Sequence, residues 1–202
     1  MFFMKKSGLL FIFFCQLFFS QSEIPKDFLK IPEVFDTTEN LYAFIQPGED
    51  VAYWKAFINN SDSEKAVLYE SQAPVSMTIL EPIPEKGFFQ NCLGENCFNY
   101  IIACKNGRSV FFLTEKNLIQ FIGKIDNVAE AILVAKTQGF LVDTSDLRGG
   151  SFTKDDENFY LKLYKQKKCS EVKESFTITI GRNNSNLTYK TNTIYSIKKA
   201  CD

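Results

Sequence analysis

Histidine is absent from the 202 residues of this chain. Its absence excludes serine–histidine–acid hydrolysis and zinc sites built on imidazole. A four-thiolate zinc site is not expected either, because Cys92 and Cys97 have no second cysteine pair at matching spacing. A phosphate-binding loop is also missing, since residues 147–151 do not have the required glycine-to-lysine spacing. We therefore assign no catalytic, metal-binding or cofactor-binding residue, and we favour a protein that is not an enzyme.

Long hydrophobic runs are missing too, except at the start of the chain. Lys5 and Lys6 precede an apolar run over residues 9–19, which ends at a serine-rich stretch. This run is shorter than the roughly 20 residues that a membrane-spanning helix needs, so it indicates a cleaved signal peptide over residues 1–20. We expect cleavage after Ser20 or Ser22, no membrane span after cleavage, and a soluble protein exported to the periplasm or the extracellular space of a bacterium.

Signal cleavage removes Cys15 and leaves five cysteines, so at least one is unpaired. An oxidising compartment favours disulfides. The short loop between Cys92 and Cys97 favours that pair, and Cys169 with Cys201 would then pin the C-terminus. Cys104 remains as a free thiol, which we expect to be buried on one face of a strand with Phe98, Tyr100 and Ile102.

The pattern of strands and helices predicts an α+β fold with antiparallel sheets. In the first half, short runs between turn signals predict strands over residues 41–46, 51–60, 65–71 and 75–80. These runs would form a β-rich unit over residues 21–84, in which Trp54 is a core residue. Pro82 and Pro84 stiffen the connection to the second unit.

The second unit, residues 85–202, is expected to contain a hairpin, a helical pair and antiparallel strands. Asn106-Gly107 predicts a hairpin between strands 98–105 and 109–113. Helices are predicted over residues 115–122, capped by Thr114, and 127–138, capped by Asp126, each ended by a glycine. This helical pair, about residues 115–138, would pack on the sheet. A short strand over residues 140–142, a loop over residues 143–158 and three alternating strands complete the chain.

The acidic residues give no clear site. Asp143 with Asp146, or the run Asp155-Asp156-Glu157, could supply oxygen ligands to calcium, but neither has the spacing of an EF-hand loop, so we interpret them as solvated loop acids. Glu130 lies on an otherwise apolar helix, where we expect it to point into solvent. It is the carboxylate we would consider first for catalysis.

The charge is segregated along the chain. Residues 158–202 carry nine lysine or arginine residues against three acidic ones, although the whole chain has a net charge of −1. Within this basic segment, lysines alternate with aromatic residues on the predicted outer face of a strand, a pattern that suits anionic or sugar partners. The candidate partner-binding residues are Tyr160, Lys162, Tyr164, Lys165 and Lys168. A solvated strand face with no partner has the same pattern.

These features predict an exported, non-catalytic interaction protein of the bacterial envelope or extracellular space. Its partner would be an anionic or glycan component of the envelope, or a protein, and we do not expect nucleic acid. Two alternatives remain open: a histidine-free hydrolase that cleaves envelope glycans with two carboxylates, and an inhibitor or immunity-type protein.

Overall fold

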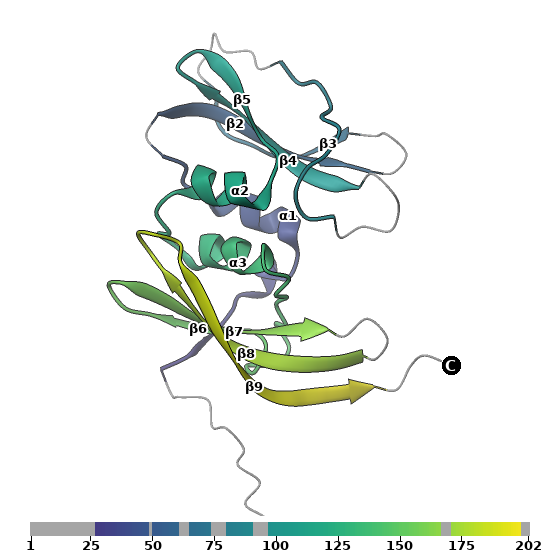
Figure 1. Cartoon of the computed structure of the whole chain (residues 1–202), viewed down its shortest axis with the longest axis vertical. Helices are drawn as coiled ribbons and strands as arrows, with labels where there is room; N and C mark the ends of the chain where they lie inside the picture. The colour runs from purple at the N-terminus through teal and green to yellow at the C-terminus, as the bar shows by residue number, and fades with distance from the viewer. Residues whose placement is uncertain are drawn as a thin grey trace, which may run out of the picture.

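The computed structural model describes residues 27–48, 50–60, 65–73, 80–90, 97–166 and 171–198. It has two antiparallel sheets with helices between them, which confirms the predicted α+β fold (Figure 1). The predicted signal peptide lies outside the described residues. So do Cys92, Cys169 and Cys201, and the two disulfides therefore stay predictions. Within the described part of the chain, no helix is long and apolar enough to cross a membrane.

The four-stranded sheet has the order β3-β2-β4-β5. Its strands are β2 (Val51–Asn59), β3 (Lys65–Glu70), β4 (Phe98–Lys105) and β5 (Arg108–Phe112). Asn106 and Gly107 turn the β4–β5 hairpin with positive φ angles of 52° and 72°, as predicted. The predicted division between residues 84 and 85 runs through this sheet, because β2 before the division pairs along its length with β4 after it.

The helices of the middle layer include the predicted pair. Helix α2 (Glu115–Ile122) begins at Thr114, whose hydroxyl accepts a hydrogen bond from the backbone N–H of Asn117, and it ends at Gly123. Helix α3 (Val128–Lys136) is capped by Asn127 and not by Asp126, one residue later than predicted. The sequence contains both cap residues side by side, and only Asn127 is followed three residues later by a glutamate that can complete a capping box.

The predicted strand over residues 41–46 is wrong. The segment continues the helix α1 (Thr38–Leu41) into the 3₁₀ helix η2 (Tyr42–Phe44), after a first 3₁₀ turn η1 (Glu33–Phe35). Leu41, Tyr42 and Ile45 are all buried, and a spacing of three or four residues between apolar side chains fits one face of a helix. A short apolar run does not distinguish the two structures by its period. The predicted strand over residues 75–80 lies almost wholly outside the described residues.

The five-stranded sheet has the order β1-β6-β7-β8-β9. Its strands are β1 (Leu29–Lys30), β6 (Ser151–Lys154), β7 (Asn158–Gln166), β8 (Glu171–Gly181) and β9 (Leu187–Lys198). Strand β6 lies in the segment 143–158 that was predicted to be loop throughout. Instead of the predicted strand over residues 140–142, only an isolated bridge joins Leu141 to Tyr164.

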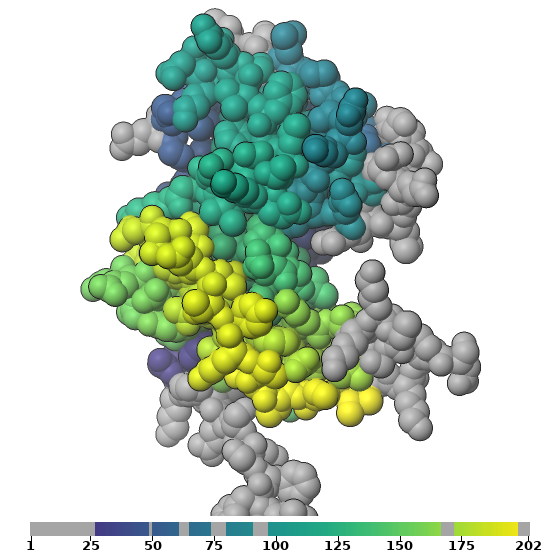
Figure 2. Space-filling model, viewed as in Figure 1, coloured from purple at the N-terminus to yellow at the C-terminus, as the bar shows by residue number. Residues whose placement is uncertain are grey.

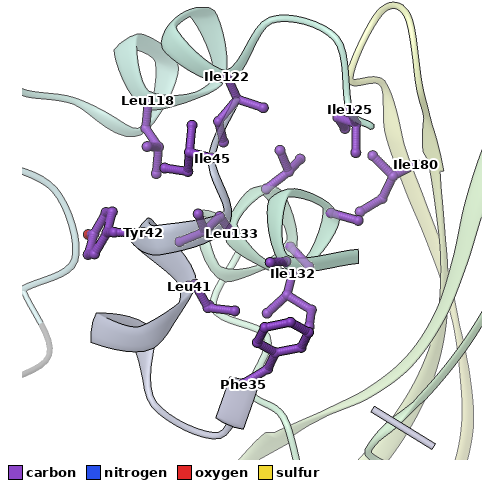
Figure 3. Packing of buried hydrophobic residues seen from close by; sticks show 14 of the residues in the cluster. Phe35, Leu41, Tyr42, Ile45, Leu118, Ile122, Ile125, Ile132, Leu133 and Ile180 are labelled. Atoms are coloured by element: carbon purple, nitrogen blue, oxygen red, sulfur yellow. The ribbon is translucent and has the colours of Figure 1, made fainter. Parts of the chain in front are cut away.

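The main core lies in the helical layer, between the two sheets. Figure 3 shows side chains of α1, α2 and α3 packing together, with Ile180 of β8 beside Ile125. Trp54 packs here against Phe121 of α2, with the ring centroids 5.0 Å apart. A second cluster lies on the opposite face of the four-stranded sheet and contains Phe57, Phe98, Tyr100, Ile102 and Cys104. Apolar groups therefore cover both faces of that sheet, whereas the five-stranded sheet buries mainly the face toward the helices.

Candidate functional site

The candidate residues of β7 divide between the two faces of the five-stranded sheet. Phe159, Leu161 and Leu163 point to the helices and are buried. The intervening residues Tyr160, Lys162 and Tyr164 therefore lie on the opposite side, which we call the outer face.

Lys165 does not continue the outer face, because the strand alternation places it with the core residues. Its ammonium nitrogen Nζ lies 4.3 Å from the ring centroid of Phe140, 5.2 Å from that of Tyr189 and 5.9 Å from that of Phe176. These rings also contact one another edge to face. Lys165 thus makes cation–π contacts within the chain instead of joining the predicted surface. Lys168 lies outside the described residues.

The alternating pattern predicted that Lys162 is exposed to solvent, but the side chain is buried. It is only 7% exposed, and its Nζ lies 5.0 Å from the ring centroid of Phe28. Burial lowers the pKa of Lys162, and repulsion from Lys190 lowers it further, whereas the charge of Asp27 has the opposite effect. No hydrogen bond or ion pair from another described residue reaches this ammonium group.

Lys162 and Lys190 lie on one row across the sheet. Strand pairing sets Lys162 of β7 opposite Thr177 of β8, and Thr177 opposite Lys190 of β9, so all three side chains share the outer face. Lys190 is exposed, and neither Lys190 nor Lys162 forms an ion pair with an acid that the structure describes. Figure 2 shows that β9, drawn in yellow, is at the molecular surface. The row thus places two lysines without an ion-paired acid among the described residues on either side of a threonine.

The tyrosines of β7 are less available for contacts with a partner. The Tyr160 hydroxyl donates a 2.8 Å hydrogen bond to Oδ2 of Asp155, which raises the pKa of Tyr160 and lowers that of Asp155. Lys173 Nζ lies over the ring of Tyr164, 5.0 Å from its centroid. The Tyr160 hydroxyl and the Tyr164 ring are therefore already in contact with side chains of this chain.

A hydrogen-bonded cluster around Asp143 occupies one end of the outer face. Although it was interpreted as a solvated loop acid, Asp143 is only 7% exposed. Its Oδ2 accepts hydrogen bonds from Lys173 Nζ at 2.6 Å and from the Tyr195 hydroxyl at 3.0 Å, while its Oδ1 accepts from Ser145. Burial acts to raise the pKa of Asp143, but these donors together lower it. The carboxylate is therefore ionised and fully engaged.

The loop over residues 143–150 is held against the sheet by this cluster. A Cβ atom at Gly150 would lie 2.1 Å from the carbonyl oxygen of Asp143, so only glycine permits this approach of the backbone. Arg148 pairs with Asp146 through two guanidinium nitrogens and also lies over the ring of Tyr195, 5.0 Å from its centroid. Consequently both acids and both cations of this end are already paired.

Glu130 is the second correction among the acids, because it is fully buried instead of pointing into solvent. Its carboxylate accepts backbone hydrogen bonds from Gln46 at 2.7 Å, from Asp126 at 2.7 Å and from Asn127 at 3.3 Å. Burial raises the pKa of Glu130, and the N–H donors oppose that effect. With three donors directed at it, this carboxylate joins the start of α3 to the segment before β2.

The sequence reasoning missed Lys190, Lys173 and Tyr195 as members of the outer face. Alternation placed Thr177 opposite the apolar residues of β8, and the same alternation in β9 could have placed Lys190 on a polar face. Their alignment with Lys162 required the register between three strands, which the sequence does not state. The contact of Asp143 with Lys173 and Tyr195 depends on the path of the loop, which only the Gly149-Gly150 pair indicates.

Cys104 is a buried, free thiol in the second cluster. Across the described ranges, no group of three or more cysteine, aspartate or glutamate side chains is arranged to hold a metal ion. The outer face thus offers positive charge and hydroxyl groups. No protein-family model, curated protein or solved structure matches this chain.

Proposed function

We propose that this protein is an exported, non-catalytic binding protein that holds an anionic ligand on the outer face of its five-stranded sheet, at Lys162 and Lys190. The ligand would be a carboxylate-, sulfate- or phosphate-bearing component of the bacterial envelope or its surroundings. Export rests on the N-terminal signal pattern, and the ligand class rests on the two lysines.

The observation that carries the proposal is the burial of Lys162 near Lys190 without a hydrogen bond or ion pair from a described residue, since Asp27 acts on it only from beyond ion-pair distance. A buried ammonium group without a compensating charge costs free energy. The repulsion between the two lysines adds to this cost. An anion bound between them would remove both penalties, which gives the site an intrinsic preference for negative charge.

The other cations of the outer face support the location of the site. Lys173 is neutralised by Asp143, and Arg148 by Asp146. Lys30, on the same face by strand register, is paired with Glu33. Among the described residues of this face, the cations without an ion pair are therefore Lys162 and Lys190. The glycan-hydrolase alternative gains no support from this face, because Asp143 and Asp146 are each held by a cation.

The test is binding of the mature protein to polygalacturonate, an acidic polysaccharide, with neutral dextran as the ligand control. Lys162→Met keeps the aliphatic stem and removes the charge, and Lys190→Gln removes the exposed charge. Each substitution should weaken binding about tenfold or more, because a hydrogen bond to a charged group contributes about 1.5–3 kcal/mol. Binding of the unsubstituted protein should also weaken as salt is added.

Lys116→Gln is the matched control, since it removes the same charge from an exposed position of α2. Thermal unfolding of all variants would show that the fold is kept. Equal binding by the Lys116 and Lys190 variants, or equal binding of dextran and polygalacturonate, would contradict the proposal.

A further inference from the structure

A cavity of about 310 Å³ opens at the end of the four-stranded sheet, remote in the fold from the outer face of the other sheet. It lies where the start of β2, the β4–β5 hairpin and the end of α2 meet. Its apolar wall consists of Val51, Val110, Phe112 and Phe121. Its volume falls at the lower end of the range of small-molecule clefts, about 300–1,000 Å³.

The cavity lies on the face of the four-stranded sheet toward α2, where Val51 and Phe112 pack against the main core. Val110 of the lining is paired with Ala103 on the neighbouring strand β4. Phe112 and Phe121 form one side of the wall, with ring centroids 4.8 Å apart and ring planes inclined at 58°. Phe112 is half-buried and Phe121 is buried behind it, so Phe112 is the more accessible of the two rings for an aromatic guest.

An ion pair completes the lining of the cavity. Lys105 Nζ lies 2.6 Å from Oδ2 of Asp50, and the two side chains are 40% and 51% exposed. The hydrogen bond from Lys105 lowers the pKa of Asp50, so the acid is ionised at neutral pH. Because water screens an exposed pair of this kind, its net stabilisation is small, and another carboxylate can replace Asp50 at Lys105 at little cost. Asp50, the more exposed partner, can then turn into solvent.

We propose that this cavity binds a small aromatic carboxylate, with its ring against Phe112 and Phe121 and its carboxylate on Lys105. The apolar wall contributes burial of the ring, and the lysine selects the charge. This site shares no residue with the anion site on the five-stranded sheet, and its ligand differs in carrying an aromatic ring.

Three probes with one ring system and different charges test the assignment by calorimetric titration of the mature protein: indole-3-acetate, indole and tryptamine. Indole-3-acetate should bind several-fold more tightly than indole, and tryptamine should bind most weakly. Lys105→Met should remove the preference for indole-3-acetate while indole still binds. Asp50→Asn should strengthen the binding of indole-3-acetate several-fold, because it removes the competing carboxylate.

Val110→Trp fills the cavity and should abolish the binding of all three probes. Its matched control is Val67→Trp, which adds the same side chain to an exposed position of the same sheet and should leave binding unchanged. If no probe binds the unsubstituted protein, or if the two tryptophan variants bind equally, the cavity is not a ligand site. If tryptamine binds most tightly, the assignment of a carboxylate ligand is wrong.

Discussion

Two buried tyrosine hydroxyls, those of Tyr42 and Tyr100, differ in how they are satisfied. The Tyr42 hydroxyl accepts a 2.8 Å hydrogen bond from the Asn99 side chain. The Tyr100 hydroxyl has no hydrogen-bond partner among the described residues, and its burial raises the pKa of Tyr100 to about 12. Burying an unpaired hydroxyl costs about 1–3 kcal/mol, so the two groups should have opposite effects on stability.

Tyr100→Phe should leave the free energy of unfolding unchanged or raise it by about 1 kcal/mol, because it removes an unsatisfied polar atom and keeps the ring. Tyr42→Phe should lower the free energy of unfolding by about 1–3 kcal/mol, because it leaves the Asn99 amide without its acceptor. Urea unfolding of both variants measures the two values. A loss of more than 1 kcal/mol in the Tyr100 variant would mean that its hydroxyl does have a partner in the native protein.

At the scale of single elements, the first turns of α2 and α3 look alike in sequence, but their glutamates differ in burial and in the hydrogen bonds they accept. Each has a polar cap residue and one glutamate in the first turn. Glu115 of α2 is exposed, whereas Glu130 of α3 is buried and accepts three backbone hydrogen bonds. The glutamate of α3 therefore fixes the chain entering β2 as well as its own helix.

Glu130→Ala should lower the free energy of unfolding by about 3 kcal/mol or more, because it leaves three backbone N–H groups without their acceptor. Glu115→Ala is the matched control, and it should cost at most about 1 kcal/mol through the helix dipole alone. Chemical denaturation followed by circular dichroism compares the two. Similar losses in both variants would show that the bonds to Gln46 and Asp126 contribute little.

Elements bounded by cap or turn residues could be predicted from the sequence. Helix α2 has Thr114 before it and Gly123 after it, and the β4–β5 hairpin has Asn106-Gly107, so both were predicted within a residue or so. Residues 41–46 have no such boundary before Pro47, and their helical structure depends on packing against α3. Lys162 was assigned to the correct face, but its burial depends on Phe28, a contact across more than 130 residues.

At the scale of the whole molecule, the chain builds each sheet from distant segments. Strands β2 and β3 precede residue 84 and β4 and β5 follow it, yet they form one sheet. The five-stranded sheet likewise takes its edge strand β1 from the start of the described chain and its other strands from the end. The helical layer between them shares one core with both.

This connectivity predicts that residues 85–202 do not fold alone. Without β2, strand β4 loses its pairing along one side and the core loses Trp54. The isolated fragment should unfold without a cooperative transition, and co-expression with residues 21–84 should restore the transition. A cooperative transition of the fragment alone would support the division between residues 84 and 85.

The free thiol of Cys104 makes the second cluster, on the four-stranded sheet, accessible to a kinetic measurement. The thiol is buried on the central strand β4, so an alkylating reagent reaches it only when the sheet or its covering opens. At saturating reagent the labelling rate equals the opening rate, and at low reagent it reports the free energy of opening. The labelling rate of Cys104 thus shows whether the four-stranded sheet opens locally or only when the whole chain unfolds.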